Sequence, residues 1–172
     1  VQYMGQNSIS RLEAEALLAG IMLDTRSFVM KAGVRTFEAA AYLRRQGADT
    51  VEVKRMFSES AATYRKKADI VGRAELYKHT AIACDTEGGP EIRIAAAQAA
   101  DELLSIKGVD ASFTLFVENG GVNISARSLG DFNVQLVMES IGGGGHLTMA
   151  GAYLKETGME QAREALVRAI DA

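Results

Sequence analysis

Apolar residues follow a helical spacing through the first part of the chain. Ser10-Arg-Leu-Glu13 is a capping box ahead of an apolar-rich run, which predicts a helix over residues 14–23. Thr36 is predicted to cap a second helix over residues 37–46, and residues 51–78 are predicted to be helical with one break. The chain is therefore expected to be all-helical up to about residue 79.

The pattern changes after residue 79, where short apolar runs alternate with glycine-containing turns. Asn119-Gly120 separates two such runs and is a strong signal for a two-residue hairpin turn. Strands are predicted over residues 80–86, 111–118, 122–127 and 150–155, and helices over residues 91–106, 132–140 and 158–169. This order indicates an α/β fold, and we place a domain boundary in the preceding helical stretch, which gives domains over residues 1–55 and 56–172.

Composition narrows the choice of partners. The chain has 172 residues, of which 48% are hydrophobic and 24% charged, with a formal net charge of -3. A dedicated duplex-DNA binder normally carries a basic stripe, so we expect no duplex DNA as a partner. No apolar run approaches the ~18 residues of a membrane helix, and Val1 is not a natural initiator. We interpret the chain as a soluble piece of a longer protein.

Four consecutive glycines, Gly142, Gly143, Gly144 and Gly145, precede His146. Ordering them costs roughly 0.5–1 kcal/mol each relative to alanine, and no apolar burial offsets this cost. Such a run suits a place where backbone N–H groups approach an anionic ligand closely, with the histidine donating to a phosphate or a base. A flexible turn is the alternative interpretation.

A second candidate site lies in the predicted strand over residues 122–127. Side chains alternate along a strand, so Asn123, Ser125 and Arg127 share one polar face. The planar fork of an arginine suits phosphate oxygens, which makes this face a candidate anion site. A solvent-facing strand surface is the other interpretation, and the short distance in sequence to the glycine run favours the first.

Asp24 follows an apolar helical run and is a third candidate. A carboxylate there suits a helix cap, a salt-bridge partner or a ligand for a hard metal ion. The chain has only two histidines and no P-loop, nucleophile-elbow or C-x-x-C motif. Neither a two-metal centre nor a nucleophilic triad can be assembled from these residues alone.

Together these features resemble the DHH phosphoesterase superfamily. Asp24, in Ala-Gly-Ile-Met-Leu-Asp-Thr, resembles the last metal motif of that family. Ser125-Ala-Arg-Ser128, followed by Gly142-Gly-Gly-Gly-His-Leu-Thr-Met-Ala-Gly151, resembles the substrate-binding motifs of the DHH-associated domain. The run from Asp24 to Ala40 is similar to that of membrane-anchored cyclic di-AMP phosphodiesterases of the GdpP type.

The resemblance implies the carboxyl-terminal tail of a DHH domain over residues 1–55, followed by a DHH-associated domain with a small mixed sheet flanked by helices. The full-length parent is then expected to hydrolyse cyclic di-AMP to linear pApA with two Mn²⁺ ions, one of them held by Asp24. Arg127, Ser125 and Ser128 are expected to bind the substrate's phosphate and sugar. The glycine run and His146 are expected to contact phosphate or base.

The resemblance also sets expectations for what surrounds the chain. The candidate partners are cyclic di-AMP or a short oligonucleotide, the upstream DHH half of the same protein, and a second copy of the chain. The parent is expected at the cytoplasmic face of the cell membrane, and the chain alone is expected to be inactive. Two alternatives stay open, which are a DHH oligoribonuclease or pAp phosphatase and a non-catalytic nucleotide- or RNA-binding module.

Overall fold

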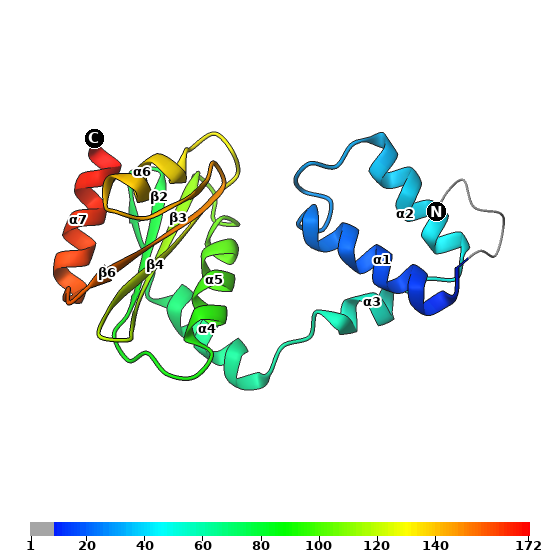
Figure 1. Ribbon diagram of the computed structural model, residues 1–172, viewed down its shortest axis with the longest axis horizontal. Coiled ribbons are helices and arrows are strands. Elements are labelled where there is room, and N and C mark those ends of the chain that lie inside the picture. The colour runs from blue at the N-terminus through cyan, green and yellow to red at the C-terminus, as the bar shows by residue number, and fades with distance from the viewer. Residues whose placement is uncertain (1–8) are drawn as a thin grey trace. The chain divides into compact units, whose positions relative to one another are not determined.

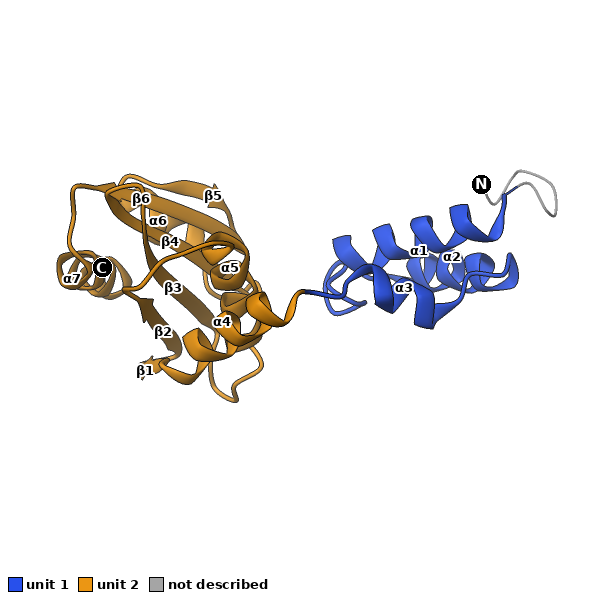
Figure 2. Ribbon diagram, turned by 90° about the horizontal axis from the view of Figure 1, so that it is seen from below, with its two compact units in different colours: residues 1–59 blue, residues 60–172 orange. Residues whose placement is uncertain are grey.

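A computed structural model describes residues 9–172, and the chain divides into two compact units, residues 1–59 and 60–172 (Figure 1, Figure 2). This division falls close to the boundary predicted between residues 55 and 56. Unit 1 is helical, whereas unit 2 contains a six-stranded sheet with helices on both of its faces (Figure 1). The predicted α/β fold is confirmed.

The described part of unit 1, residues 9–59, contains three helices: α1 (Arg11–Asp24), α2 (Val34–Arg45) and α3 (Thr50–Met56). The predicted capping box starts α1, because the Ser10 hydroxyl accepts a hydrogen bond from the Glu13 N–H at 3.3 Å and the Glu13 carboxylate accepts one from the Ser10 N–H at 2.7 Å. The second helix begins at Val34, earlier than predicted. Thr36 lies inside its first turn, and its hydroxyl accepts a hydrogen bond from the Gly33 N–H.

A small core holds the helices of unit 1 together. Its buried apolar residues are Ala14, Leu18, Leu43, Ala48 and Val53. The buried carboxylate of Glu15 adds a polar link, since it accepts hydrogen bonds from Arg11 Nε at 2.7 Å and from the Asp49 N–H at 3.2 Å. Glu15 therefore ties α1 to the start of α3.

Unit 2 carries the sheet and four helices. In chain order its elements are α4 (Ala61–Gly72), β1 (Glu75–Tyr77), β2 (Thr80–Asp85), α5 (Ile92–Leu103), β3 (Ala111–Glu118), β4 (Gly121–Ser128), α6 (Val134–Ser140), β5 (Gly144–His146), β6 (Met149–Lys155) and α7 (Met159–Asp171). The strand order is β1-β2-β3-β4-β6-β5, with β2 and β3 parallel and all other neighbours antiparallel. The crossover between the parallel strands is α5.

Two predictions about elements were wrong. The long helical stretch was expected to reach residue 78, but α4 ends at Gly72 and residues 75–77 form β1 against β2. The glycine run was left outside the predicted strands, but Gly144–His146 forms β5 against β6. Both are three-residue edge strands, and pairing with a neighbour rather than local sequence preference decides their conformation.

The β3–β4 hairpin is the centre of the sheet. Asn119 and Gly120 both have positive φ angles, 53° and 77°, as the predicted two-residue turn requires. This turn fixes the register in which Phe116 lies opposite Asn123 and Thr114 lies opposite Ser125. The register in turn decides which side chains of neighbouring strands share a face.

The two faces of the sheet are covered differently. On one face, α6 and α7 pack on all the long strands, and the buried side chains there include Phe113, Ile124 and Leu166. On the other face, α4 and α5 pack against β2, β3 and part of β4. The hydroxyls of Ser112 and Thr114 donate to carbonyls of α5 and fix this helix in place. The part of this face formed by β4, β6 and β5 lies beside α5, and we call it the open face.

Candidate functional site

The open face is organised as three rows of side chains that run across the strands. Residues directly opposite each other in paired antiparallel strands project to the same side of a sheet. The amide row is Phe116, Asn123 and Tyr153, the glycine row is Ser125, Gly151 and Gly144, and the arginine row is Arg127, Met149 and His146. The predicted alternation of Asn123, Ser125 and Arg127 therefore places one of these residues in each row.

The arginine row brings two of the predicted site residues onto one face. Arg127 is 9% exposed, its Nη1 donates to the Ala126 carbonyl at 2.9 Å, and its Nε lies 3.4 Å from a carboxylate oxygen of Asp101 on α5. His146 is exposed at the outer edge strand, two strands away. The Arg127 guanidinium is thus held between β4 and α5 at one end of the open face.

The four glycines have different structural roles. Gly142 follows α6 with a φ of 84°, a conformation that favours glycine. A Cβ at Gly143 would lie 2.3 Å from the Gly151 carbonyl oxygen, and one at Gly145 would lie 2.4 Å from the Ala150 Cα. Close packing against β6 therefore excludes side chains at these two positions.

Gly144 is the exception in the run. A Cβ there would meet nothing within 4 Å, and its φ is not in the left-handed region. Because Gly144 belongs to the glycine row, a side chain at this position would stand on the open face. Of the predicted run, Gly144 is therefore the residue on the open face at which the fold itself leaves room for a side chain.

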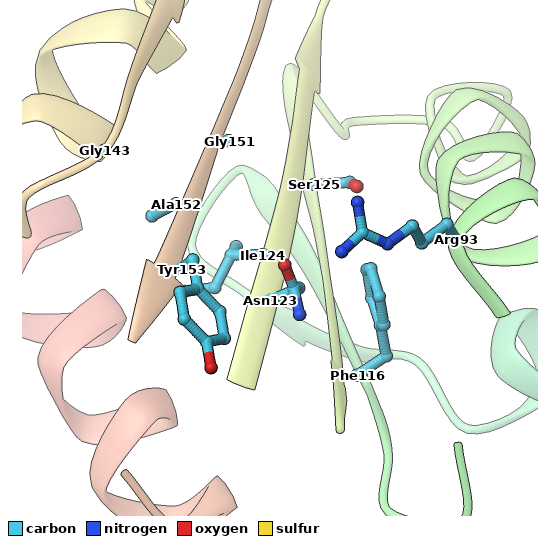
Figure 3. A pocket seen from close by; sticks show the side chains of 9 residues that line it. All are labelled: Arg93, Phe116, Asn123, Ile124, Ser125, Gly143, Gly151, Ala152 and Tyr153. Carbon is cyan, nitrogen blue, oxygen red and sulfur yellow. The ribbon is translucent and has the colours of Figure 1, made fainter. Parts of the chain in front are cut away.

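A hollow of about 370 Å³ lies over the amide row and the glycine row. Figure 3 shows Arg93 reaching from α5 toward Asn123 and Ser125, with Tyr153 on the opposite side. The lining residues are Arg93, Phe116, Asn123, Ile124, Ser125, Gly143, Gly151, Ala152 and Tyr153. A volume of this size is at the lower end of the ~300–1,000 Å³ typical of small-molecule sites.

Sequence reasoning did not select Arg93, Phe116 or Tyr153. Arg93 comes from the first turn of α5, and its Nε hydrogen-bonds to Glu118. Tyr153 and Gly151 are two residues apart in β6 and therefore share a face, which is a signal the sequence does contain. Only the pairing of β6 with β4 brings Tyr153 next to Asn123, and this pairing cannot be predicted from the local sequence.

Ser128 lies apart from the other predicted residues. It is fully buried, and its hydroxyl donates to the Leu147 carbonyl at 3.3 Å. Ser128 is paired with Ala111, whose side chain belongs to the core under α6 and α7, so it faces away from Arg127. This position supports a structural role in fixing the β5–β6 connection rather than contact with a ligand on the open face.

Asp24 is the exposed last residue of α1 in unit 1. The chain continues through three left-handed residues, Arg26, Ser27 and Phe28, with φ angles of 45°, 55° and 68°. The Thr25 hydroxyl braces this turn by donating to an α1 carbonyl at 2.7 Å and accepting from the Phe28 N–H at 2.9 Å. Such backbone is uncommon away from glycine, and it holds the segment after Asp24 in a defined shape.

A metal centre is not complete within the part of the chain that the structure describes. No group of three or more His, Cys, Asp or Glu side chains among residues 9–172 is arranged to hold a metal ion. Across the same residues, no helix combines the length and apolarity needed to cross a membrane. Asp24 on its own supplies one carboxylate.

A buried ion pair stabilises the helical layer beside the open face. Asp85, at the end of β2, accepts a hydrogen bond from the Gly88 N–H at 2.8 Å and lies 2.7 Å from Lys66 Nζ on α4. Burial lowers the pKa of Lys66, but hydrogen bonds and attraction to Asp85 and Glu87 outweigh it, so that the pKa is raised overall. This pair joins α4 to the loop that starts α5.

Comparison with known proteins identifies the fold family. Residues 91–172 match the DHHA1 domain model. The chain belongs to the DHH/DHHA1 superfamily. The open face, the glycine run and Arg127 all lie within the matched DHHA1 domain.

The curated relatives extend the DHH/DHHA1 assignment over nearly the whole chain. The chain is 51% identical over 164 residues to the cyclic-di-AMP phosphodiesterase GdpP of Geobacillus thermodenitrificans, covering 94% of this chain and 25% of the relative. It is 44% identical over 166 residues to the cyclic-di-AMP phosphodiesterase PdeA of Listeria monocytogenes, covering 95% and 25%. The chain therefore spans about a quarter of the length of these relatives.

A solved structure shares the arrangement of elements. An exopolyphosphatase-related protein from Bacteroides fragilis superimposes with a TM-score of 0.84 at 26% identity, covering 98% of this chain and 52% of that protein. The DHH/DHHA1 fold is thus supported by structure as well as by sequence.

Proposed function

We propose that this chain is the carboxyl-terminal, substrate-binding part of a phosphodiesterase that hydrolyses cyclic di-AMP to linear pApA. The proposal rests on the open face, where the arginine row, with Arg127 and His146, lies next to the glycine row, which has no large side chain. Identities of 44–51% to cyclic-di-AMP phosphodiesterases support the choice of substrate. An anionic ligand fits this face because the arginine row offers cationic and hydrogen-bond donor groups, while the glycine row lets the ligand approach the backbone.

Arg127 is the residue that we propose binds the phosphate. Asp101 and the Ala126 carbonyl hold its guanidinium in one orientation, so less side-chain freedom is lost when an anion binds. Gly144 allows the phosphate or sugar to lie close to β5, and His146 donates from the edge of the site. Ser125, in the glycine row, contributes a hydroxyl to the same surface.

The metal ions of the proposed enzyme are not accounted for by this chain. Asp24 is one carboxylate, and two divalent ions need several more oxygen or nitrogen ligands. In our proposal an upstream DHH half supplies those ligands for Mn²⁺, with Asp24 added as one of them. The isolated chain is then inactive, and it carries the substrate-binding surface alone.

The surface of unit 1 supports an upstream half. Large apolar side chains are exposed there, including Leu23 and Val29, each 71% exposed, and Val34 at 77%. Exposed apolar side chains in this number are unfavourable in water unless another part of the protein covers them. In the proposed parent the upstream DHH half packs on these helices, and segments further upstream anchor the protein at the cytoplasmic face of the membrane.

The test uses the parent protein with purified cyclic di-AMP, and kcat/KM is measured from the formation of pApA. Charge-assisted hydrogen bonds contribute roughly 1.5–3 kcal/mol each, so Arg127→Ala is expected to lower kcat/KM by about ten- to a hundredfold. Arg127→Lys should recover only part of this loss, because a point charge does not replace a planar fork. A change of less than about twofold for Arg127→Ala would remove the proposed role of the open face.

Two glycine variants separate binding from folding. Gly144→Val should lower kcat/KM while the melting temperature stays near that of the unmodified protein, since an added Cβ there has no atom of the fold within 4 Å. Gly143→Val is the matched control and should destabilise unit 2, because its Cβ would collide with the Gly151 carbonyl. Equal loss of stability in both variants would mean that Gly144 is also structural.

A second candidate function has one supporting observation. The chain is 37% identical over 65 residues, or 38% of its length, to the bifunctional oligoribonuclease and PAP phosphatase NrnA of Thermus thermophilus. The same phosphate-binding surface would serve short oligonucleotides. Comparing kcat/KM of the parent for cyclic di-AMP and for a linear dinucleotide decides between the two.

A further inference from the structure

Asp101 on α5 is the acidic neighbour of Arg127, the arginine of the open face. One of its carboxylate oxygens lies 3.4 Å from Arg127 Nε, and the two side chains come from different elements, α5 and β4. The Arg127 side chain is 10% exposed, whereas that of Asp101 is 44% exposed. The carboxylate is therefore accessible to solvent, while the guanidinium that it contacts is almost covered.

The position of Asp101 is set by β3, the strand on which α5 packs. Ser112 is fully buried, and its hydroxyl donates to the carbonyl of Ala100, the residue before Asp101, at 2.5 Å. Ser112 also lies directly opposite Arg127 in the pairing of β3 with β4. Thr114 donates to a carbonyl one turn earlier in α5 at 2.9 Å. The strand beside the arginine thus fixes the register of α5, and the fold itself holds the carboxylate at Arg127.

Other cations along the open face are paired in the same way. Arg93 Nε hydrogen-bonds to Glu118. Lys155 is two residues beyond Tyr153 in β6 and shares its face, and its Nζ lies 3.3 Å from a carboxylate oxygen of Glu156. The positive charges of Arg127, Arg93 and Lys155 are therefore each compensated by a carboxylate. A site built to hold a multiply charged anion would instead leave positive charge in excess.

Charge compensation changes which phosphate groups the open face accepts. A phosphodiester carries one negative charge, whereas a terminal phosphate monoester carries about 1.5–2 at pH 7, because its second pKa is about 6. A compensated guanidinium still donates hydrogen bonds to phosphate oxygens. The neighbouring carboxylate, however, repels the added charge of a monoester. The pair of Arg127 and Asp101 therefore suits a phosphodiester better than a terminal phosphate.

We propose that Asp101 is a positioning residue that acts through Arg127 and determines specificity, favouring a phosphodiester over a terminal phosphate monoester. This inference rests on the proposed function, in which both phosphates of cyclic di-AMP are diesters and the product pApA has gained a terminal phosphate. Asp101 weakens the binding of this product relative to the substrate. Release of pApA is thereby favoured, and its use as a further substrate is disfavoured.

The test compares two linear dinucleotides, ApA and pApA, which differ by the terminal phosphate. Each inhibits the parent protein in an assay that follows release of 4-nitrophenol from bis(4-nitrophenyl) phosphate, and the ratio Ki(pApA)/Ki(ApA) is measured. For Asp101→Asn the ratio is expected to fall about three- to thirtyfold, because a negative charge next to Arg127 is removed while the shape of the side chain is kept. Asp101→Glu keeps the charge and should keep the ratio within about twofold.

Glu102→Gln is the matched control. Glu102 is the next residue of α5, and its carboxylate lies 3.5 Å from Lys67 Nζ on α4 rather than at Arg127. The variant changes the net charge by the same amount as Asp101→Asn and should leave the ratio unchanged. An equal fall in Glu102→Gln would overturn the proposal, because net charge rather than the position of the carboxylate would be its cause.

An unchanged ratio in Asp101→Asn would also overturn the proposal. This includes an equal rise of both inhibition constants, which would mean that Asp101 orients Arg127 without selecting between phosphate groups. A fall of the ratio in Asp101→Glu as large as in Asp101→Asn would overturn it too, since the charge is retained there. If the unmodified parent does not hydrolyse cyclic di-AMP, the proposed function fails, which is a different result, because the ratio is measured with another phosphodiester.

Discussion

The two units of the chain bury their apolar side chains to very different extents. In unit 2, helices fill both sides of a sheet, and side chains such as Phe113, Leu115 and Leu166 are fully buried. Among residues 9–59 of unit 1, the buried apolar core has five members, while many larger apolar side chains face solvent. The exposed ones include Leu12, Leu23, Val29, Val34, Phe37 and Val51. Unit 2 has what an independently folding domain needs, and unit 1 does not.

Separating the units should give the largest effect. Residues 60–172 alone are expected to unfold cooperatively with a melting temperature near that of the whole chain. Residues 9–59 alone are expected to lose most of their helix, because short helices without a sufficient core are marginal in water. Circular dichroism melts of the two pieces measure this, and a cooperative transition in the shorter piece would contradict it.

Truncating a core side chain in each unit tests whether the two units differ in stability. Phe113→Ala should destabilise unit 2 by about 3–5 kcal/mol, because it leaves a cavity in a closely packed core. Leu18→Ala should loosen unit 1 and leave the unfolding transition of unit 2 nearly unchanged. Urea unfolding followed by signals from each unit separates the two effects. Ile94→Ala, at a position 55% exposed, is the control and should change stability by no more than about 0.5 kcal/mol.

Acid should loosen unit 1 before unit 2. The hydrogen bond from Arg11 lowers the pKa of Glu15, and hydrogen bonds from Ser10 lower that of Glu13. A carboxylate whose folded pKa is depressed stabilises the fold above its unfolded pKa of about 4.3, and this contribution is lost as pH falls through the folded pKa. Helical signals from unit 1 should therefore fall below about pH 4.

Glu15→Gln tests the origin of this acid sensitivity. The variant should make unit 1 less stable near neutral pH and flatten its response to acid. Asp171→Asn is the matched change in unit 2, where hydrogen bonds from Lys78 and Tyr77 lower the pKa of Asp171. Loss of structure in unit 2 before unit 1 on acidification would contradict the predicted order of unfolding.

The smallest effect is expected for Asp24→Ala. Within residues 9–172 the structure gives this carboxylate no hydrogen bond or ion pair, and it is exposed. The melting temperature of the chain should change by less than about two degrees. In the parent the same change should reduce turnover and Mn²⁺ binding, if the proposed role as a ligand is correct. A loss of several degrees in the chain alone would favour a helix-cap or salt-bridge role.

Elements with local signals were predictable from the sequence. The strand over residues 111–118 and the Asn119-Gly120 turn were predicted with the bounds that the structure has, because alternation and turn chemistry lie within a few residues. β1 and β5 were missed because three-residue edge strands depend on a partner far along the chain. α2 begins before its predicted cap, because the Thr36 hydroxyl accepts a hydrogen bond from the Gly33 N–H and Thr36 therefore lies inside the first turn.

The candidate site was predictable in part for the same reason. Alternation along one strand placed Asn123, Ser125 and Arg127 on a common face. Asp101, which pairs with Arg127, and the aromatic partners of Asn123 come from other elements, so only the tertiary structure adds them. The glycine run was predicted to let the backbone approach an anionic ligand, but at Gly143 and Gly145 the group that lies close is β6.

The strand order β4-β6-β5 has a consequence for synthesis of the chain on the ribosome. β5 precedes β6 in the sequence, yet β6 lies between β5 and β4, so β5 has no partner until β6 emerges. Until then the edge of β4 is unpaired and carries Ile124 and Ala126 toward the core, which is the kind of edge that recruits other chains. A message truncated before codon 149 would therefore yield an aggregation-prone product, whereas one truncated just after codon 155 would already encode the complete sheet.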